Sequence, residues 1–179
     1  YVDNDNVYAA HLITDHLLDL GYRNITLITD NDVFAVAKDR IKGFTRALEK
    51  RGIEAEGRVV NCSSNKVSIR KTLVELLEKE SVDAILTLDG VINALVLSCL
   101  YCMKVRIPED VATATFNDSP MTELAAPPQT TVDIHPQELG REAGREIINL
   151  VRNPQRLKRN ITVPVSIIER RSTQKEEGR

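Results

Sequence analysis

The sequence predicts an α/β fold in which a parallel sheet carries helices on both faces, and two observations lead to this expectation. First, short runs of uncharged, β-favouring residues alternate with longer segments whose apolar residues repeat at helical spacing. Second, residues 83–90 and 111–118 each contain an unbroken uncharged run that stops at polar residues, which is typical of strands buried on both faces. Strict alternation of helix and strand is typical of a parallel sheet with right-handed crossovers.

The first part of the chain supplies these alternating elements. Residues 3–6 form a cluster of helix-capping side chains, and Gly21 stands where the first helix ends. In that helix Leu20 continues the apolar spacing set by Leu17, so we expect both to point inward. The expected strands cover residues 24–29, 59–60, 83–88 and 111–116, and the expected helices end near residues 20, 51, 80 and 103.

The alternation changes after residue 118. Residues 120–125 are expected to form a single helical turn, and Pro127-Pro128 forces an extended path. A proline also interrupts the last expected strand, over residues 161–168, which is therefore an edge or crossover segment.

A long helix is expected to begin at Pro136, because proline is favoured at the first helical position. Glycine inside a helix costs about 1 kcal/mol relative to alanine, so Gly140 and Gly144 predict the close approach of a neighbouring backbone. The inner face of this helix is expected to consist of Leu139, Ala143, Ile147, Leu150 and Val151.

Composition and charge exclude several classes of function. The 179 residues suffice for one domain or slightly more. With 24 Lys and Arg against 26 Asp and Glu, the chain has no basic excess with which to bind a phosphate backbone. No apolar run approaches the ~20 residues of a membrane helix, and the start does not resemble a signal peptide. Three cysteines, an odd number, favour a reducing compartment, so we expect a cytoplasmic protein without a membrane partner.

Five motifs follow one another in a fixed order. They are Val2-Asp3-Asn4-Asp5, then His16-Leu17 with Gly21 and Ile25, then Arg40-Ile41-Lys42-Gly43-Phe44, then Ile107-Pro108-Glu109-Asp110-Val111 with Phe116-Asn117-Asp118, and finally Pro127-Pro128-Gln129-Thr130-Thr131-Val132 with Leu139-Gly140 and Ala143. Each motif is loose alone, but the five in this spacing are specific. From residue 2 to about residue 171, the chain resembles the effector-binding half of the lactose-repressor (LacI/GalR) family of bacterial transcription regulators.

The resemblance implies a class I periplasmic-binding-protein-like fold, of which this chain holds one lobe and a piece of the other. Residues 1–129 would form the carboxyl-terminal lobe, 130–158 would belong to the amino-terminal lobe, 159–171 would return, and 172–179 would be a mobile tail. The apolar face of the long helix would pack into an amino-terminal lobe outside this sequence, and alone it would require an oligomer or be disordered. Operator DNA would be bound only through a headpiece that is also outside this sequence, and no cofactor is implied.

The resemblance also implies a binding site for a sugar or phosphosugar effector at the strand ends. Arg40 would hold effector hydroxyls with its planar donor group, unless it is a surface arginine paired with Asp39. Asn117 stands where the family usually has aspartate, and it would contact the effector unless it is only a turn residue. Asp89 would either contact the effector or only cap the next helix. Ser63 lies where sugar-binding relatives carry a stacking aromatic, which leaves the effector's identity open.

A homodimer is the protein partnership that the resemblance implies. In the family, the helix after Asp89 and the segment after the 111–118 strand lie at the dimer interface, although ordinary core packing fits the same spacing. The residues expected at this interface are Asn93, Met121, Leu124 and Ala125. Effector binding would close the two lobes and shift the dimer between geometries that hold the headpieces differently on operator DNA.

Two other functions fit parts of the sequence. An exported sugar-binding protein of the same fold would follow a signal peptide instead of a helix-turn-helix. A flavodoxin-like enzyme or receiver domain would use Asp30, Asp32 and Asp89, but a receiver also needs a lysine at a strand end, and none occurs. Cys99 and Cys102 lie well inside a helix, so we interpret them as buried small hydrophobes. The chain has no G-x-S-x-G or Walker motif and no metal-ligand spacing between histidines and cysteines, so we expect neither a metal nor enzyme activity.

Overall fold

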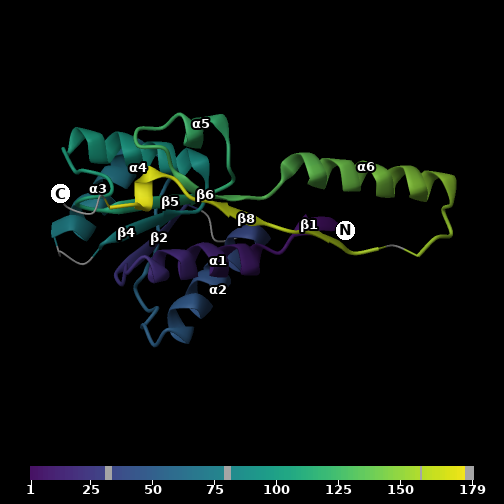
Figure 1. Cartoon of the computed structure of the whole chain (residues 1–179), viewed down its shortest axis with the longest axis horizontal. Helices are drawn as coiled ribbons and strands as arrows, with labels where there is room; N and C mark the ends of the chain where they lie inside the picture. Colours follow the sequence, from purple (N-terminus) through teal and green to yellow (C-terminus); the bar gives the residue numbers. More distant parts are fainter. Residues whose placement is uncertain (31–33, 79–81, 158, 176–179) are drawn as a thin grey trace.

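A six-stranded sheet forms the centre of the computed structural model, which describes residues 1–30, 34–78, 82–157 and 159–175 (Figure 1). The strand order is β3-β2-β4-β5-β6-β8, in which the first five strands are parallel and β8 is antiparallel to β6. Every residue of β2, β4 and β5 is buried, as their uncharged runs predicted. The strands of this sheet are β2 (Ile25–Thr29), β3 (Val59–Asn61), β4 (Ala84–Thr87), β5 (Ala112–Phe116), β6 (Thr130–Asp133) and β8 (Ser166–Ile168).

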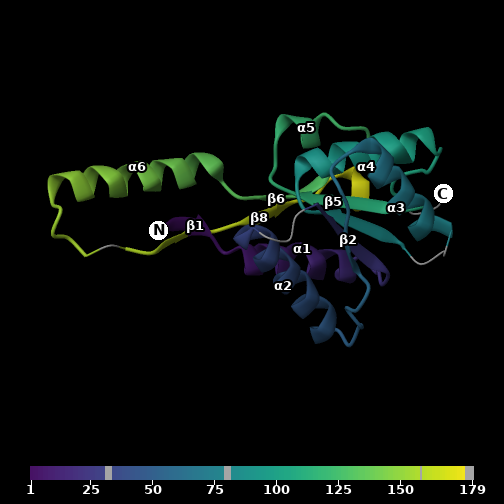
Figure 2. The same ribbon diagram turned by 180° about the vertical axis from the view of Figure 1, so that it is seen from behind.

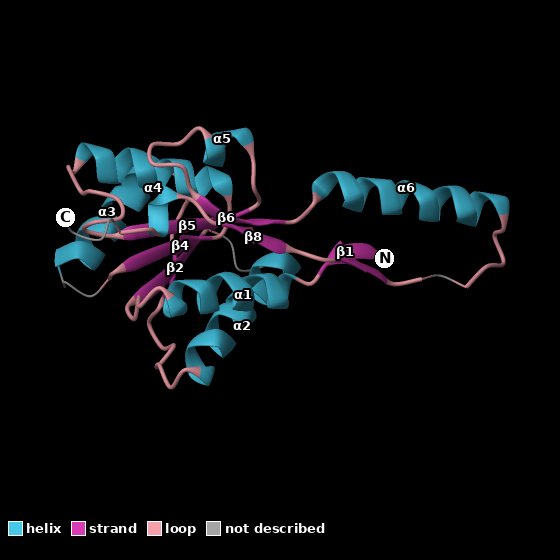
Figure 3. Ribbon diagram, viewed as in Figure 1, coloured by secondary structure: helices cyan, strands magenta, loops and turns pink. Residues whose placement is uncertain are grey.

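Helices cover both faces of this sheet, so the predicted architecture is confirmed (Figure 3). One face carries α1 and α2, and the other carries α3, α4 and the short α5. Because neighbouring strand residues point to opposite faces, Leu27 joins the core with Phe44 of α2, whereas Ile28 joins the core with Leu73 of α3. The helices of the two layers are α1 (Asn6–Asp19), α2 (Ala35–Lys50), α3 (Lys66–Glu78), α4 (Gly90–Cys102) and α5 (Pro120–Glu123).

One helix stands apart from the two layers. α6 (Pro136–Arg152) projects from the body beside a two-stranded parallel sheet made of β1 (Val2–Asn4) and β7 (Ile161–Val163) (Figure 2). No residue of α6 is buried, and Ile147 and Val151 are exposed. Leu139, Ala143 and Leu150 of the predicted apolar face are half-buried, so within the described residues this face is only partly covered.

A single carboxamide ties together the three segments that join the body to the projecting part. These segments are the β1–α1, β6–α6 and β7–β8 connections. The Nδ2 group of Asn4 donates to the carbonyl oxygen of Ile134 at 3.1 Å and to that of Val163 at 3.0 Å. Asn4 and Val163 are the last residues of β1 and β7, where two of these connections begin, and Ile134 lies in the third, so the Asn4 side chain holds all three in register.

The structure moves the expected lobe boundaries. β6, expected in the amino-terminal lobe, is paired with β5 and β8 in the body sheet. β1, expected in the carboxyl-terminal lobe, instead pairs with β7 in the projecting part, and β7 lies inside the expected return segment. The chain therefore leaves the body after Asp133 and re-enters it between Val163 and Ser166.

Local expectations near the first helix and the last strand also change. β1 occupies residues where only capping side chains were expected, and of these Asp5 is the N-cap, accepting a hydrogen bond from the backbone N–H of Tyr8 at 2.8 Å. Leu20 follows the helix end and is exposed, whereas Leu18 is buried, so the inward orientation expected for Leu20 is wrong. Pro164 separates β7 from β8, in agreement with the predicted interruption.

Two further expectations are wrong within the described residues. No atom outside α6 lies within 4 Å of a Cβ built at Gly140 or Gly144, so no backbone approaches them closely. Ser172 and Thr173, expected in a mobile tail, are buried in the short 3₁₀ helix η1 (Arg171–Thr173). The reason is hydrogen bonding, because the Ser172 hydroxyl accepts from the backbone N–H of Thr130 at 2.8 Å. Residues 176–179 of the expected tail lie outside the described residues.

The close contact of α1 and α2 provides a test of this packing. A Cβ added at Gly43 would lie 2.1 Å from the carbonyl oxygen of Val7 and 2.8 Å from the Cβ of Ala10. We expect Gly43→Ala to lower the free energy of unfolding by about 2 kcal/mol, because the two helices must separate. Gly144→Ala is the control, since that site is open and alanine favours the helix by up to about 1 kcal/mol. Urea unfolding measures both changes, and equal effects would contradict the packing.

Candidate functional site

The four predicted effector-binding residues all follow parallel strands of the body sheet. Ser63 follows β3, Asp89 follows β4 and Asn117 follows β5, while Arg40 lies in α2, which follows β2. The carboxyl ends of parallel strands meet at one edge of a sheet, and open α/β sheets bind their ligands there. The topology therefore places all four residues toward the edge where a ligand is expected.

Arg40 is held at this edge by three acceptors. Its Nη1 donates to the carbonyl oxygen of Leu88 at 2.7 Å, its Nη2 to Oδ1 of Asn117 at 2.9 Å, and its Nε to Oδ1 of Asn6 at 3.3 Å. Only 4% of the residue is exposed, so the interpretation of Arg40 as a surface arginine paired with Asp39 is wrong. The acceptors come from the start of α1, from the residue after β4 and from the residue after β5. The guanidinium is therefore held in one orientation by three separate segments.

An aromatic ring and two carboxylates set the electrostatic environment of Arg40. Its guanidinium carbon lies 4.3 Å from the centroid of the Phe116 ring, which is cation–π geometry. Burial lowers the pKa of Arg40 to about 10, while the charges of Asp89 and Asp3 act in the opposite direction. Arg40 therefore stays protonated at neutral pH, and its planar donor group has a defined orientation.

Asn117 meets Arg40 from the end of β5, although the two residues are 77 positions apart. Its backbone has a φ of +65°, in the left-handed region that asparagine tolerates better than most residues. The turn interpretation of Asn117 is thus confirmed, and it is compatible with the predicted site because the turn brings Oδ1 to Arg40. Contact of either side chain with an effector stays a prediction.

Asp89 and Ser63 are placed differently from this pair. Asp89 is the N-cap of α4 and accepts from the backbone N–H groups of Val91 at 2.8 Å and Ile92 at 2.9 Å, which confirms the capping interpretation. Ser63 is exposed and lines a hollow of about 470 Å³ together with residues of α3 such as Thr72. Whether either residue contacts an effector stays a prediction.

The residues predicted at a dimer interface divide into two groups. Met121 and Leu124 are 61% and 82% exposed, and Ala125 is half-buried, so all three are available to a partner. Asn93 is only 2% exposed, and its Nδ2 donates to Oε1 of Gln129 at 3.2 Å. The prediction for Asn93 is wrong, because this side chain points into the interior between α4 and the sheet.

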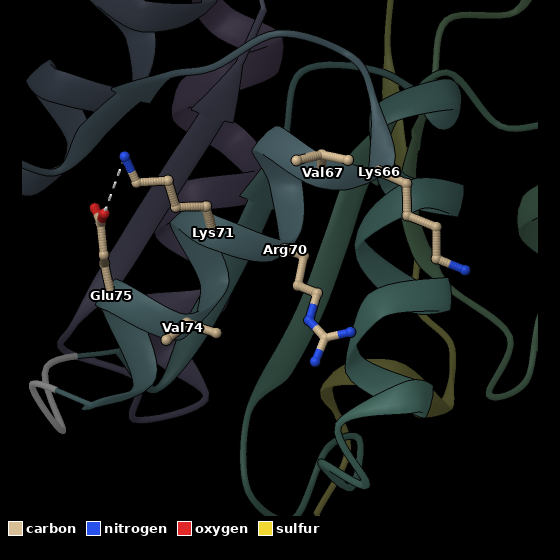
Figure 4. A pocket seen from close by; sticks show the side chains of 6 residues that line it. All are labelled: Lys66, Val67, Arg70, Lys71, Val74 and Glu75. Atoms are coloured by element: carbon tan, nitrogen blue, oxygen red, sulfur yellow. Dashed lines mark ion pairs between the residues drawn. The ribbon is translucent and has the colours of Figure 1, made fainter.

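A second hollow lies on α3, away from Arg40 and Asn117 (Figure 4). It has a volume of about 560 Å³, and Lys71 and Glu75 on its wall form an ion pair at 3.9 Å. No predicted effector-binding residue lines it. Its walls consist of Lys66, Val67, Arg70, Lys71, Val74 and Glu75.

The remaining candidate residues are the acidic residues of the receiver alternative and the two cysteines of α4. Over residues 1–30, 34–78, 82–157 and 159–175, no group of His, Cys, Asp or Glu is arranged to hold a metal ion, and Asp32 lies outside these ranges. Cys99 is buried, and burial raises the pKa of its thiol. Cys102 is exposed as the last residue of α4, so its interpretation as a buried hydrophobe is wrong. No described helix is long and apolar enough to span a membrane.

Three partners of Arg40 were not identified from the sequence. The sequence indicates Asn6 only as one of several capping side chains. In the structure it is buried, and its Oδ1 accepts a hydrogen bond from Nε of Arg40. Leu88 contributes a backbone carbonyl, which no side-chain pattern reveals. In the sequence Phe116 is only part of a motif. Its position directly before Asn117 is the one signal that an aromatic ring accompanies the site.

Comparison with known proteins agrees with this geometry. A family model described as a periplasmic binding protein-like domain matches residues 14–173. The transcriptional regulator MalR of Staphylococcus xylosus is 37% identical over 174 residues, which cover 97% of this chain and 51% of that protein. A probable maltose operon repressor MalR from Staphylococcus superposes with a TM-score of 0.89 at 34% identity, covering 97% of this chain and 61% of that structure.

A third similar protein has been solved with a sugar. The transcriptional regulator CelR in complex with cellobiose superposes with a TM-score of 0.86 at 27% identity, covering 96% of this chain and 53% of that structure. These similar proteins are transcription regulators and not enzymes, so they give no support to the flavodoxin-like enzyme or receiver alternative.

The left-handed backbone of Asn117 leads to a measurable difference between two variants. Asn117→Ala and Asn117→Gly both remove the acceptor that Arg40 uses. Alanine also pays about 1–2 kcal/mol for the positive φ, which glycine does not. We therefore expect the alanine variant to be less stable than the glycine variant by about this amount in urea unfolding. Equal stabilities of the alanine and glycine variants would mean that the turn changes conformation, so that residue 117 no longer has a positive φ.

Proposed function

The chain belongs to the periplasmic binding protein-like effector domains of LacI-family transcription regulators, and we propose that it senses a small sugar and thereby controls operator DNA binding. The contact between Arg40 and Asn117 at the carboxyl edge of the sheet carries this proposal. A planar guanidinium beside a carboxamide offers several donors and one acceptor, which suits adjacent hydroxyls of a sugar. A site of this kind binds a ligand without needing a cofactor or a metal.

A two-lobed arrangement accounts for the only partly covered apolar face of α6. The chain spans about half the length of the curated relatives it matches. We infer that α6, β1 and β7 complete an amino-terminal lobe whose remaining residues lie outside this sequence. The effector would lie between that lobe and the edge that carries Arg40. Asn4, which bonds to both other connecting segments, would then sit at the hinge.

The signal would reach DNA through a change in lobe geometry. An effector that binds the closed form more tightly than the open form shifts the population toward closure, by as much as its difference in affinity. By linkage, operator binding would change the affinity for the effector by the same factor. The DNA contacts would come from a headpiece outside this sequence, and the regulator would work in the cytoplasm.

A homodimer is supported by apolar side chains on one layer of the body. Helices α3, α4 and α5 lie next to one another over the same face of the sheet (Figure 1). Exposed apolar side chains on such a layer are typical of an interface with another protein. The exposed apolar residues of this layer are Val67, Val91, Tyr101, Met121 and Leu124.

Maltose and cellobiose are the first ligands to test, because the similar structures include a probable maltose operon repressor and a cellobiose complex. At 100 times its dissociation constant, a ligand stabilises the folded state by about 2.7 kcal/mol. The relatives are about twice as long as this chain, and for a protein of that length this corresponds to a rise in Tm of about 3–5 °C. We expect one of these sugars, or its phosphorylated form, to produce such a rise in the full-length protein.

Arg40→Lys tests whether this edge binds the sugar. Lysine keeps the charge but not the planar donor group, so we expect the Tm rise at the same sugar concentration to fall by at least half. Arg106→Lys is the control, since Arg106 is exposed and paired with Asp110 outside the site. An unchanged response of Arg40→Lys would contradict the proposed effector site.

The proposed dimer surface is tested by a charge at one of its most exposed apolar residues. Leu124→Glu would bury a carboxylate in the interface, so we expect the dimer dissociation constant in sedimentation equilibrium to rise at least about tenfold. Leu20→Glu is the control, because Leu20 is exposed at the end of α1 on the opposite face. Equal dissociation constants for the two variants would place the interface elsewhere.

A further inference from the structure

We propose that Asp118 is a positioning residue that transmits effector binding at Asn117 to α5, and so to the surface that carries Met121 and Leu124. The proposal rests on the proposed function, because it concerns how the same site would reach the dimer surface. Asp118 is the residue directly after Asn117, so a rearrangement of the Asn117 backbone moves the peptide that carries Asp118. The Asp118 carboxylate contacts three separate elements.

The first two contacts fix the carboxylate against the sheet and the return segment. Oδ1 of Asp118 accepts from Nη1 of Arg170 at 2.6 Å and from the hydroxyl of Thr131 at 2.9 Å. The same Nη1 also donates to the carbonyl oxygen of Gln129 at 2.9 Å. Arg170 follows β8, which enters the body directly from the projecting part. Asp118 is therefore bonded to the segment that directly follows β8, the strand with which the chain re-enters the body.

The third contact reaches α5. The hydroxyl of Thr122 lies 3.2 Å from Oδ1 of Asp118 and 2.8 Å from the carbonyl oxygen of Ser119, and it can donate to either one. It accepts from the backbone N–H of Ser119 at 3.0 Å. Thr122 is buried, and its carbonyl oxygen accepts from the backbone N–H of Gln129 at 2.9 Å. Its helix neighbours Met121 and Leu124 are exposed, so α5 has an anchored inner side and an outer side free for a partner.

The length of α5 makes this anchoring decisive. A helix of four residues has too few internal hydrogen bonds to be stable alone, so its orientation depends on the contacts that hold it. Displacement of the Asp118 carboxylate by a change at Asn117 therefore changes the position of Thr122 and of the apolar side chains beside it. Arg170 holds the same carboxylate from the segment after β8, so the carboxylate is bonded both to α5 and to the strand that leads in from the projecting part.

Hydrogen exchange of the full-length protein with maltose or cellobiose tests the proposal. In the wild type we expect the bound sugar to slow exchange in residues 36–44 around Arg40. It should also change exchange at residues 119–125 about fivefold or more, the lower end of ordinary coupling between sites. In Asp118→Asn, which removes the charge that Arg170 meets, residues 36–44 should still be protected while the response of 119–125 falls below about twofold.

Three further variants distinguish a loss of the signal to α5 from a general loss of stability of the fold. Asp15→Asn is the control, because Asp15 on α1 is 19% exposed, close to the 22% of Asp118, and pairs with Arg51 at 3.2 Å. It should keep both responses. Thr122→Val removes the hydroxyl that meets Asp118 and that also bonds to the backbone of Ser119, whereas Thr122→Ser keeps that hydroxyl. The response of 119–125 should be lost only in Thr122→Val, which keeps the test available if Asp118→Asn fails to fold.

The outcomes distinguish this inference from the proposed function. A full response of residues 119–125 in Asp118→Asn or Thr122→Val overturns the role of Asp118. Loss of protection at residues 36–44 in a folded Asp118→Asn also overturns it, because the residue would then be needed for binding itself. A wild type in which neither sugar nor its phosphorylated form protects residues 36–44 overturns the proposed function and the relay together.

Discussion

The burial of the Arg40 guanidinium is the interaction on which the carboxyl edge of this sheet depends. A charged group taken out of water must find acceptors, and a buried donor left without one costs about 1–3 kcal/mol or more. Here the acceptors come from the start of α1, the end of β4 and the end of β5. These segments must therefore stay in register with α2. A residue that fixes four elements in this way is well suited to report the arrival of a ligand.

The rest of the molecule divides into a closed body and an open projecting part. The body buries two apolar cores, one on each face of the sheet. α6 also has a clear apolar stripe, but within the described residues it is only partly covered, and Ile147 and Val151 are exposed. Helices draw most of their stability from tertiary packing, so this stripe is the strongest physical sign that a second set of elements belongs here. Asn4 joins the two parts where their relative motion would occur.

Polar side chains, and not apolar ones, connect the effector edge to the outer surface. Asp118, Arg170 and Thr122 form a partly buried network in which the hydrogen bonds strengthen one another because water has limited access. Such a network has few alternative arrangements, because breaking one bond leaves a buried group without a partner. An apolar core in the same position could repack gradually. The network gives α5 a defined orientation relative to Asn117, which is what a switch between two states requires.

The sequence by itself determined the elements and the class of site. Unbroken uncharged runs fixed β4 and β5, Asp89 was recognised as a capping side chain, and Pro136 marked the start of α6, because each depends on neighbours within a few residues. Only the tertiary structure decided which side chains meet across the fold. It turned Asn93 inward and gave Arg40 its partner Asn6. These outcomes depend on packing between segments distant in the chain, which local spacing does not encode.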